Sequence, residues 1–202
     1  VDSSIPQECL DQDCGFQNNP FKTISRALEM INPSESNPIT IHLAAGTYSP
    51  ETGEIFPINL ISNLNIRGED EEATVIDAMG TNRVVYLDNI INNIISDLTI
   101  RGGSALWDFS GGIENLNLFN YSGGGIFLNN SNPYINNVII KNNIANRGGG
   151  VFLSNSNPEM SNITIVDNSA YFGGGLLLSD FSNPNLTNTT IANNSADEIG
   201  SG

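Results

Sequence analysis

Between Gly123 and Gly202 the chain repeats one sequence unit three times: GGGIFLNNSNPYINNVIIKNNIANR from Gly123, GGGVFLSNSNPEMSNITIVDNSAYF from Gly148 and GGGLLLSDFSNPNLTNTTIANNSADEI from Gly173. The units begin 25 residues apart, and Gly200 opens a fourth copy 27 residues after Gly173. A fixed period of this length is typical of stacked structural repeats, each of which contacts its neighbours along one axis.

Each unit contains short runs in which apolar residues alternate with polar ones. Val138 and Ile140 form one such pair, and Ile163 and Ile165 occupy the same positions one unit later. Period-two alternation indicates strands, and the runs are too short for helices. Because a single coil cannot bury its apolar side alone, we predict an all-β fold in which about six coils stack as a parallel β-helix, a solenoid.

Stacking in register also predicts columns of like residues along the solenoid. The polar column expected at one turn contains Asn142, Asp167 and Asn193. The neighbouring bend is expected to be filled by Ala145, Ala170 and Ala196. A third column consists of Phe127, Phe152 and Leu177. It lies between inward pairs, so it is either an exposed contact surface or, if the alternation is inverted there, buried.

The repeat motif GGG-[IVL]-x-L, followed by S-N-P and I-x-x-N-x-(S/I)-A, resembles the repeats of right-handed β-helix proteins in the pectin-lyase-like superfamily. It is also similar to the repeats of chlamydial polymorphic outer-membrane proteins. Upstream, NPFKTISRALEMI, ITIHLAAGTYSPETGEIFPI and LNIRGEDEEATVIDA resemble the uncharacterised domain that opens many secreted bacterial β-helix proteins. These resemblances cover Asn19 to Gly202 and imply a right-handed solenoid. They imply little about function, because the superfamily contains lyases, hydrolases, adhesins and proteins without known activity.

The composition disfavours several classes of partner. With 202 residues the chain is long enough for one well-buried domain, and its net charge of −15 disfavours nucleic acid and anionic membrane surfaces. No apolar run approaches the ~18 residues of a membrane span, so membrane insertion is not expected. The chain begins at Val1 without a signal-like stretch, and we expect that a leader was removed or lies outside this sequence.

Residues 1–18 form an acidic segment that contains the chain's two cysteines, Cys9 and Cys14. Two thiols this close in an otherwise cysteine-free chain predict a small disulfide loop in an oxidising compartment, and free thiols are the alternative. No cofactor is implied, although Glu8, Asp11 and Asp13 are candidate oxygen ligands for Ca²⁺ if they are not simply solvated. We therefore expect a secreted or cell-surface protein.

The predicted β-helix spans residues 19–202 and opens with a capping α-helix over residues 19–32. Asn19 is the expected N-cap and Pro20 the first helical residue, and apolar residues recur along one face of the segment. Such a helix would cover strand edges and apolar side chains at the open end of the stack. At the opposite end Gly200 begins a new coil, so end-to-end self-association into a fibre is one functional hypothesis.

Residues 39–122 form coils of uneven length, with the excess residues expected in side loops before the regular repeats of residues 123–202. The largest side loop, residues 104–122, contains Trp107 and Tyr121. Loops of this length in compact domains are usually functional or disordered. The two rings are candidates for stacking on sugar faces, and packing of the loop against the coils is the alternative.

A basic stripe is predicted on the outer surface of four consecutive coils. In each of them the residue after an inward-facing isoleucine points outward. These outward residues are His42, Arg67, Arg101 and Lys141. Stacked at the strand spacing, they would suit a carboxylated or sulfated glycan. Pairing with nearby acids such as Glu69 is the structural alternative.

The stripe also supports an enzymatic hypothesis. In a polysaccharide lyase a cation neutralises a uronate carboxylate while Arg or Lys removes the C5 proton, and Asp77, Asp88 and Asp97 are candidate metal ligands for that role. The repeats themselves carry no catalytic cluster at motif spacing. We therefore favour a non-catalytic structural or adhesive module that binds glycan or a partner protein. The alternatives are a lyase or another carbohydrate-active enzyme, and a self-assembling fibre subunit.

Overall fold

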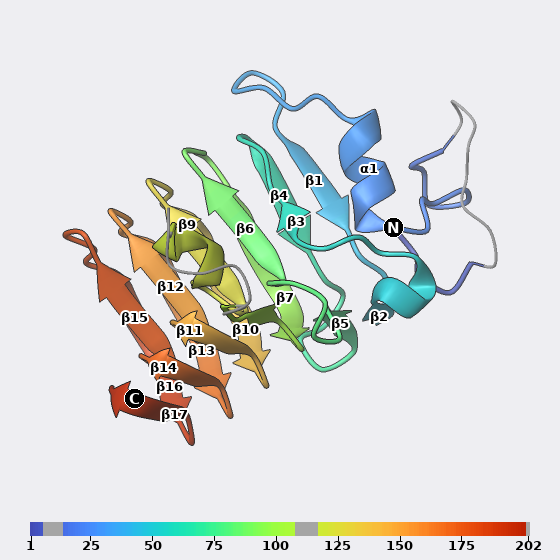
Figure 1. The fold of residues 1–202 in the computed structure, drawn as a ribbon. Coiled ribbons are helices and arrows are strands. Elements are labelled where there is room, and N and C mark those ends of the chain that lie inside the picture. The colour runs from blue at the N-terminus through green and yellow to red at the C-terminus, as the bar shows by residue number, and fades with distance from the viewer. Residues whose placement is uncertain (6–13, 108–116, 201–202) are drawn as a thin grey trace.

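The computed structural model describes residues 1–5, 14–107 and 117–200, and it confirms the parallel β-helix. Figure 1 shows the coils stacked side by side, from the N-terminal end with its single α-helix to the C-terminal strands. Every pair of hydrogen-bonded strands in the three sheets is parallel, as stacking of successive coils requires. Of the helices in the described ranges, none is long and apolar enough to cross a membrane.

The walls of the solenoid are three sheets. The largest sheet contains β1 (Ile39–His42), β4 (Leu64–Arg67), β7 (Ile94–Arg101), β10 (Tyr134–Lys141), β13 (Glu159–Val166) and β16 (Asn185–Ala192), joined by the short strands β2 (Gly46–Tyr48) and β5 (Thr74–Asp77). The second sheet contains β3 (Ile58–Asn59), β6 (Val85–Asp88), β9 (Ile126–Asn129), β12 (Val151–Ser154) and β15 (Leu176–Ser179). The third contains β8 (Ser104–Ala105), β11 (Ile144–Arg147), β14 (Ser169–Phe172) and β17 (Ser195–Ile199).

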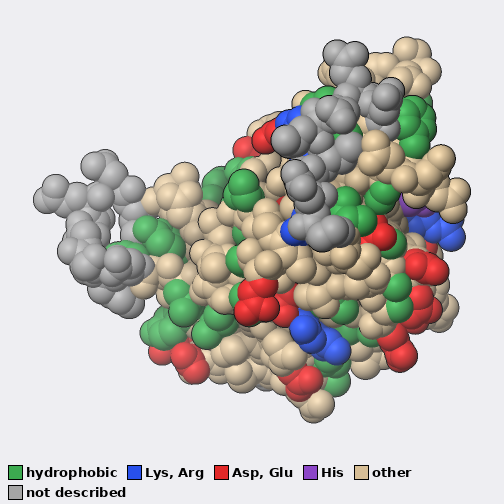
Figure 2. Space-filling view, turned by 90° about the vertical axis from the view of Figure 1, so that its right-hand side faces the viewer, with side chains coloured by type: hydrophobic (Ala, Val, Ile, Leu, Met, Phe, Trp, Pro, Cys, Tyr) green, Lys and Arg blue, Asp and Glu red, His purple; other side chains and the backbone are tan. Residues whose placement is uncertain are grey.

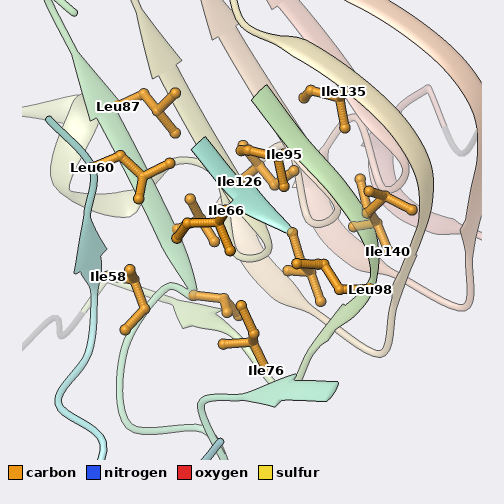
Figure 3. Close-up of a cluster of buried hydrophobic side chains, with 14 of the residues drawn as sticks. Ile58, Leu60, Ile66, Ile76, Leu87, Ile95, Leu98, Ile126, Ile135 and Ile140 are labelled. Atoms are coloured by element: carbon orange, nitrogen blue, oxygen red, sulfur yellow. The ribbon is translucent and has the colours of Figure 1, made fainter. Parts of the chain in front are cut away.

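The register places like residue on like residue, as the repeat predicts. Val138 lies opposite Ile163, and the buried Ala145 lies opposite the buried Ala170. Inward-facing aliphatic side chains from the first and second sheets meet along the axis and form one core (Figure 3). Because these side chains are almost completely removed from water, their burial is the main contribution to stability.

One turn of each regular coil is held by asparagines. The predicted column of Asn142, Asp167 and Asn193 is present, and all three residues have φ of 55°, in the left-handed region that Asn and Asp tolerate. This conformation turns the following residue of each coil inward. Those residues are Asn143, Asn168 and Asn194. They are buried and linked side chain to side chain at 2.9 and 3.0 Å, which forms an internal asparagine ladder.

The capping helix is shorter than predicted. α1 spans Ile24–Met30, and its N-cap is Thr23 rather than Asn19. Glu54, itself buried, accepts hydrogen bonds from the backbone N–H of Ile24 (2.6 Å) and Ser25 (2.9 Å). The carboxylate accepts hydrogen bonds from N–H groups that have no partner within the first turn of a helix, so the helix begins at this point. Its buried face extends the core at the N-terminal end, as a cap should.

Candidate functional site

An aromatic ladder lies on the outer face of the second sheet. Tyr86, Phe127 and Phe152 are in register on β6, β9 and β12. Their ring centroids are 4.9 and 5.4 Å apart, with interplanar angles of 10° and 15°, so the three rings are stacked. The ladder follows directly from the fold, because parallel strands in register place equivalent side chains one strand spacing apart.

A side loop covers most of this ladder. The 3₁₀ helix η3 (Leu118–Tyr121) places Phe119 against Phe127 and Phe152, with centroid distances of 5.6 and 6.1 Å. Phe127 and Phe152 are therefore 1% and 0% exposed although they lie outside the central core. Leu177, the next residue in this column, is only partly exposed. Phe127 and Phe152 are therefore buried although they point outward from the sheet. The side loop covers them, and the alternation of inward and outward residues is not inverted.

Arg83 fixes the cover to the sheet. Its Nη2 donates hydrogen bonds to the carbonyl oxygens of Phe119 (2.8 Å) and Asn120 (2.7 Å). Its guanidinium carbon lies 4.8 Å from the Phe127 ring centroid and 5.4 Å from that of Tyr86. Only 6% of Arg83 is exposed, and this burial lowers its pKa to about 10. The side chain is therefore still a cation at neutral pH.

Tyr86 ends the ladder and leaves one ring face without an aromatic neighbour. Phe127 covers one face, but on the other side β3 presents Asn59 at the position in register with Tyr86. A shallow cavity of about 350 Å³ opens there, which we call the Tyr86 cavity. Its walls are Pro57, Asn59, Asn82, Arg83, Tyr86 and Asn120. The cavity thus combines an aromatic ring, three amide side chains and one cation.

Hydrogen bonds to Asp88 orient the Tyr86 hydroxyl. The Tyr86 O–H donates to Asp88 Oδ2 at 3.2 Å, and the amides of Asn89 and Asn129 donate to Asp88 Oδ1 at 2.7 Å. Burial and the neighbouring carboxylate raise the pKa of Tyr86. The phenol is therefore protonated at neutral pH, and its ring is held at a fixed angle at the edge of the cavity.

The predicted basic stripe is divided into two pairs. His42 lies opposite Arg67, and Arg101 lies opposite Lys141. Arg67 is not next to Arg101, because β4 pairs only with the first half of β7 and the second half pairs with β5. The prediction of four stacked basic residues is therefore wrong. A ligand-binding role for these residues stays a prediction.

Both arginines of the former stripe are paired with acids. Arg67 Nε lies 3.1 Å from Asp97 Oδ2, and Arg101 Nε lies 2.8 Å from Asp77 Oδ2. Their partners are thus not Glu69 or its neighbours in the acidic loop. Arg67 and His42 also line a cavity of about 820 Å³ at the N-terminal end. Figure 2 faces this end and shows the histidine beside a basic side chain, with acidic side chains making up most of the other charged surface.

The Arg101–Asp77 pair is expected to contribute little to stability. The Arg101 side chain is 39% exposed, and ion pairs in contact with water contribute about 0–1 kcal/mol. We therefore expect Arg101→Ala to lower the free energy of unfolding by no more than about 1 kcal/mol in urea titrations. Lys141→Ala, at a position with no ion pair in the described chain, is the control. A loss of about 3 kcal/mol would instead indicate a buried pair.

The remaining predicted residues have different outcomes. Trp107 and Tyr121 contact each other, with centroids 5.9 Å apart, so the loop ends pack together and their sugar-binding role stays a prediction. Cys14 is disulfide-bonded, but its predicted partner Cys9 lies outside the described residues. Glu8, Asp11 and Asp13 lie outside them too, so the Ca²⁺ prediction is untested. Within the described ranges, no three His, Cys, Asp or Glu side chains gather as a metal site would require.

Comparison with known proteins identifies the fold more closely than the function. A model of the family described as protein of unknown function, DUF1565, matches residues 9–200. A search of curated proteins gave no match. A solved pectin methylesterase mutant in complex with a hexasaccharide is 16% identical, with a TM-score of 0.52 over 88% of this chain and 55% of its own.

Two further solved structures are more distant. They are a pectin methylesterase with a hexasaccharide (14% identity, TM-score 0.45) and pectin methylesterase PemA from Erwinia chrysanthemi (14% identity, TM-score 0.43). Each match covers 90% of this chain and 66% of the other. The chain thus spans between half and two thirds of the proteins it matches. At these identities the likeness shows the right-handed β-helix fold alone.

Proposed function

This chain belongs to the DUF1565 family of proteins of unknown function, and we propose that it acts as a non-catalytic, glycan-binding β-helix module of a secreted or cell-surface protein. The observation that carries the proposal is the Tyr86 cavity. A tyrosine ring that lines the cavity, stacked on Phe127 on one side and with its hydroxyl held by Asp88, offers an apolar platform with a polar edge. Such a surface matches a sugar ring, whose faces are apolar and whose rim is polar.

The amide side chains around the platform support the same ligand class. Asn59, Asn82 and Asn120 line the cavity, and each amide supplies both donors and an acceptor, as the hydroxyls of a sugar require. A few convergent polar groups beside an apolar wall are typical of small-molecule sites. The fold is also able to present oligosaccharide sites, since the neighbouring pectin methylesterase was solved in complex with a hexasaccharide.

The non-catalytic part of the proposal rests on the ion pairs. A lyase would use an arginine or lysine that is free to take a proton, but Arg67 and Arg101 are each held by an aspartate. Lys141, which has no ion pair among the described residues, does not line the Tyr86 cavity. The Tyr86 cavity offers no alternative base of that kind, because Arg83 is bonded to two carbonyls and remains protonated at neutral pH. Binding without turnover is therefore the function that this geometry favours.

Tyr86→Ala tests the proposal on a glycan array followed by calorimetry with the best oligosaccharide. We expect wild-type binding and a loss of about 10- to 30-fold in the variant, as for a central aromatic contact. Tyr86→Phe should keep most of the affinity, because the ring remains. Tyr134→Ala, which removes an exposed tyrosine from a different sheet, should bind like wild type.

Two results would overturn the proposal. One is an array on which wild type binds no glycan, and the other is a folded Tyr86→Ala variant that binds as tightly as wild type. The same oligosaccharides should be followed by ultraviolet absorbance for the unsaturated uronates that a lyase releases. Their appearance would show that the protein is an enzyme and would contradict the proposal of a non-catalytic binding module.

A further inference from the structure

Arg83 is the one charged side chain in the wall of the Tyr86 cavity. We propose that this cavity selects sugars that carry an anionic group, a carboxylate or a sulfate, and that Arg83 is the residue that recognises it. The inference rests on the proposed glycan-binding function and adds the chemical class of the ligand.

Arg83 has hydrogen-bond donors that the described chain does not use. A guanidinium carries five N–H groups, and only Nη2 of Arg83 is engaged, by the carbonyls of Phe119 and Asn120. Nε and Nη1 form no hydrogen bond with the described residues, and neither atom is fully buried. Both therefore retain contact with solvent, in a side chain that lines the cavity.

Arg83 also has no ion-pair partner among the described residues. The three ion pairs of the described residues involve Arg26, Arg67 and Arg101, all more exposed than Arg83. Asp88, which accepts the Tyr86 O–H, already accepts three hydrogen bonds and forms no ion pair with Arg83. Arg83 is the most buried of the five arginines, and within the described residues it forms no ion pair with a carboxylate.

A purely structural role does not account for this arrangement. Fixing η3 needs only the two bonds from Nη2, and a neutral amide would supply them without the cost of burying a cation. Burying an unpaired charge is unfavourable, and stacking on Tyr86 and Phe127 offsets only part of that cost. An anion that enters the cavity and binds the open Nε and Nη1 groups would remove the remaining cost.

The position of Arg83 suits a sugar held on the platform. Its guanidinium carbon is 5.4 Å from the Tyr86 ring centroid, so a group carried by a ring stacked on Tyr86 comes within reach of the open donors. Charge-assisted hydrogen bonds to carboxylate or sulfate are about twice as strong as neutral ones. Asn59 Nδ2 and both polar atoms of the Asn82 amide already bond to neighbouring backbone, so the Asn120 amide and Asn59 Oδ1 are the groups available for the uncharged hydroxyls.

Calorimetry with three matched probes tests the inference: a uronic-acid oligosaccharide, the same oligosaccharide after carboxyl reduction, and a sulfated oligosaccharide. We expect wild type to bind at least one anionic probe about 10-fold or more tightly than the reduced one. Arg83→Gln should lose this preference but keep its affinity for the reduced probe. Arg83→Lys, which keeps the charge, should retain part of the preference.

Each other outcome has a defined meaning. Equal affinity of wild type for all three probes would overturn the anion selectivity while leaving glycan binding intact. Binding of none of them, together with a silent glycan array, would remove the proposed function itself. If Arg83→Gln does not fold, the Arg83 side-chain NMR signals of wild type decide. A shift with the anionic but not the reduced probe is expected, and no shift would contradict the assignment.

Discussion

Asn168→Ala is expected to lower the free energy of unfolding by about 3–4 kcal/mol, because it interrupts the buried asparagine ladder. Asn168 is 1% exposed. Its Oδ1 accepts from both the N–H and the Nδ2 of Asn143, and its Nδ2 donates to the carbonyl of Ile140 and to Asn194 Oδ1. Alanine would remove the partner of the Asn143 N–H and a partner of the Ile140 carbonyl, whereas Asn143 Nδ2 keeps the Ile100 carbonyl and Asn194 Oδ1 keeps the N–H of residue 168. Each buried group left unpaired costs about 1–3 kcal/mol before relaxation.

Urea unfolding followed by circular dichroism measures this loss. Asn185→Ala is the matched control, because Asn185 is exposed on β16 and its side chain makes no hydrogen bond within the described residues. That variant should stay within about 0.5 kcal/mol of wild type. A ladder variant as stable as the control would show that water enters the turn and replaces the asparagine, contrary to its burial.

The repeat was sufficient to predict the regular half of the fold and the polar column at Asn142, but not the buried ladder one residue later. The sequence shows two adjacent columns, Asn142 with its equivalents and Asn143 with its equivalents, and both look alike. Only the backbone separates them, since the left-handed φ of 55° at Asn142 leaves that residue at the surface and directs Asn143 inward. Composition carries no signal for that choice.

In the irregular half the alignment of coils by sequence is wrong, because one coil contains two strands, β4 and β5, that belong to the same sheet. Ile66 was expected to align with Ile100, but it lies opposite Ile95, and Ile100 lies opposite Ile76 on β5. The alternation in Thr74–Asp77 was visible in the sequence and would have identified β5. Without it, Arg67 and Arg101 appear as neighbours when they belong to different ion pairs.

The candidate site was missed for a related reason. Tyr86 and Phe127 are neighbours in the ladder but 41 residues apart, because the side loop after β8 interrupts the 25-residue period. Arg83 lies in no recognisable sequence motif. What distinguishes it is its burial, which only the fold reveals. Tyr121 lies in η3, which covers the ladder through Phe119, and Trp107 contacts Tyr121; a sugar-binding role of these two rings stays a prediction.

Close backbone contacts in the glycine triplets give the last prediction: Gly149→Ala should destabilise the protein by about 3 kcal/mol or more. A Cβ at Gly149 would lie 2.3 Å from the carbonyl oxygen of Ser169 and 2.6 Å from that of Gly174, and both are backbone atoms of the next coil. The Gly174 carbonyl accepts the N–H of Gly150 at 3.0 Å, so moving it away would break a bond between coils.

Gly80→Ala is the control that separates the effect of this clash from the effect of losing the conformational freedom of glycine. Gly80 has φ of +78° but nothing within 4 Å of its Cβ position, so its substitution should cost only the left-handed backbone, about 1–2 kcal/mol. Gly149 has no positive φ, and its effect is therefore steric alone. If the two variants unfold at the same urea concentration, the coils have room to separate. The glycine triplets would then be needed for their turns and not for the close stacking of the solenoid.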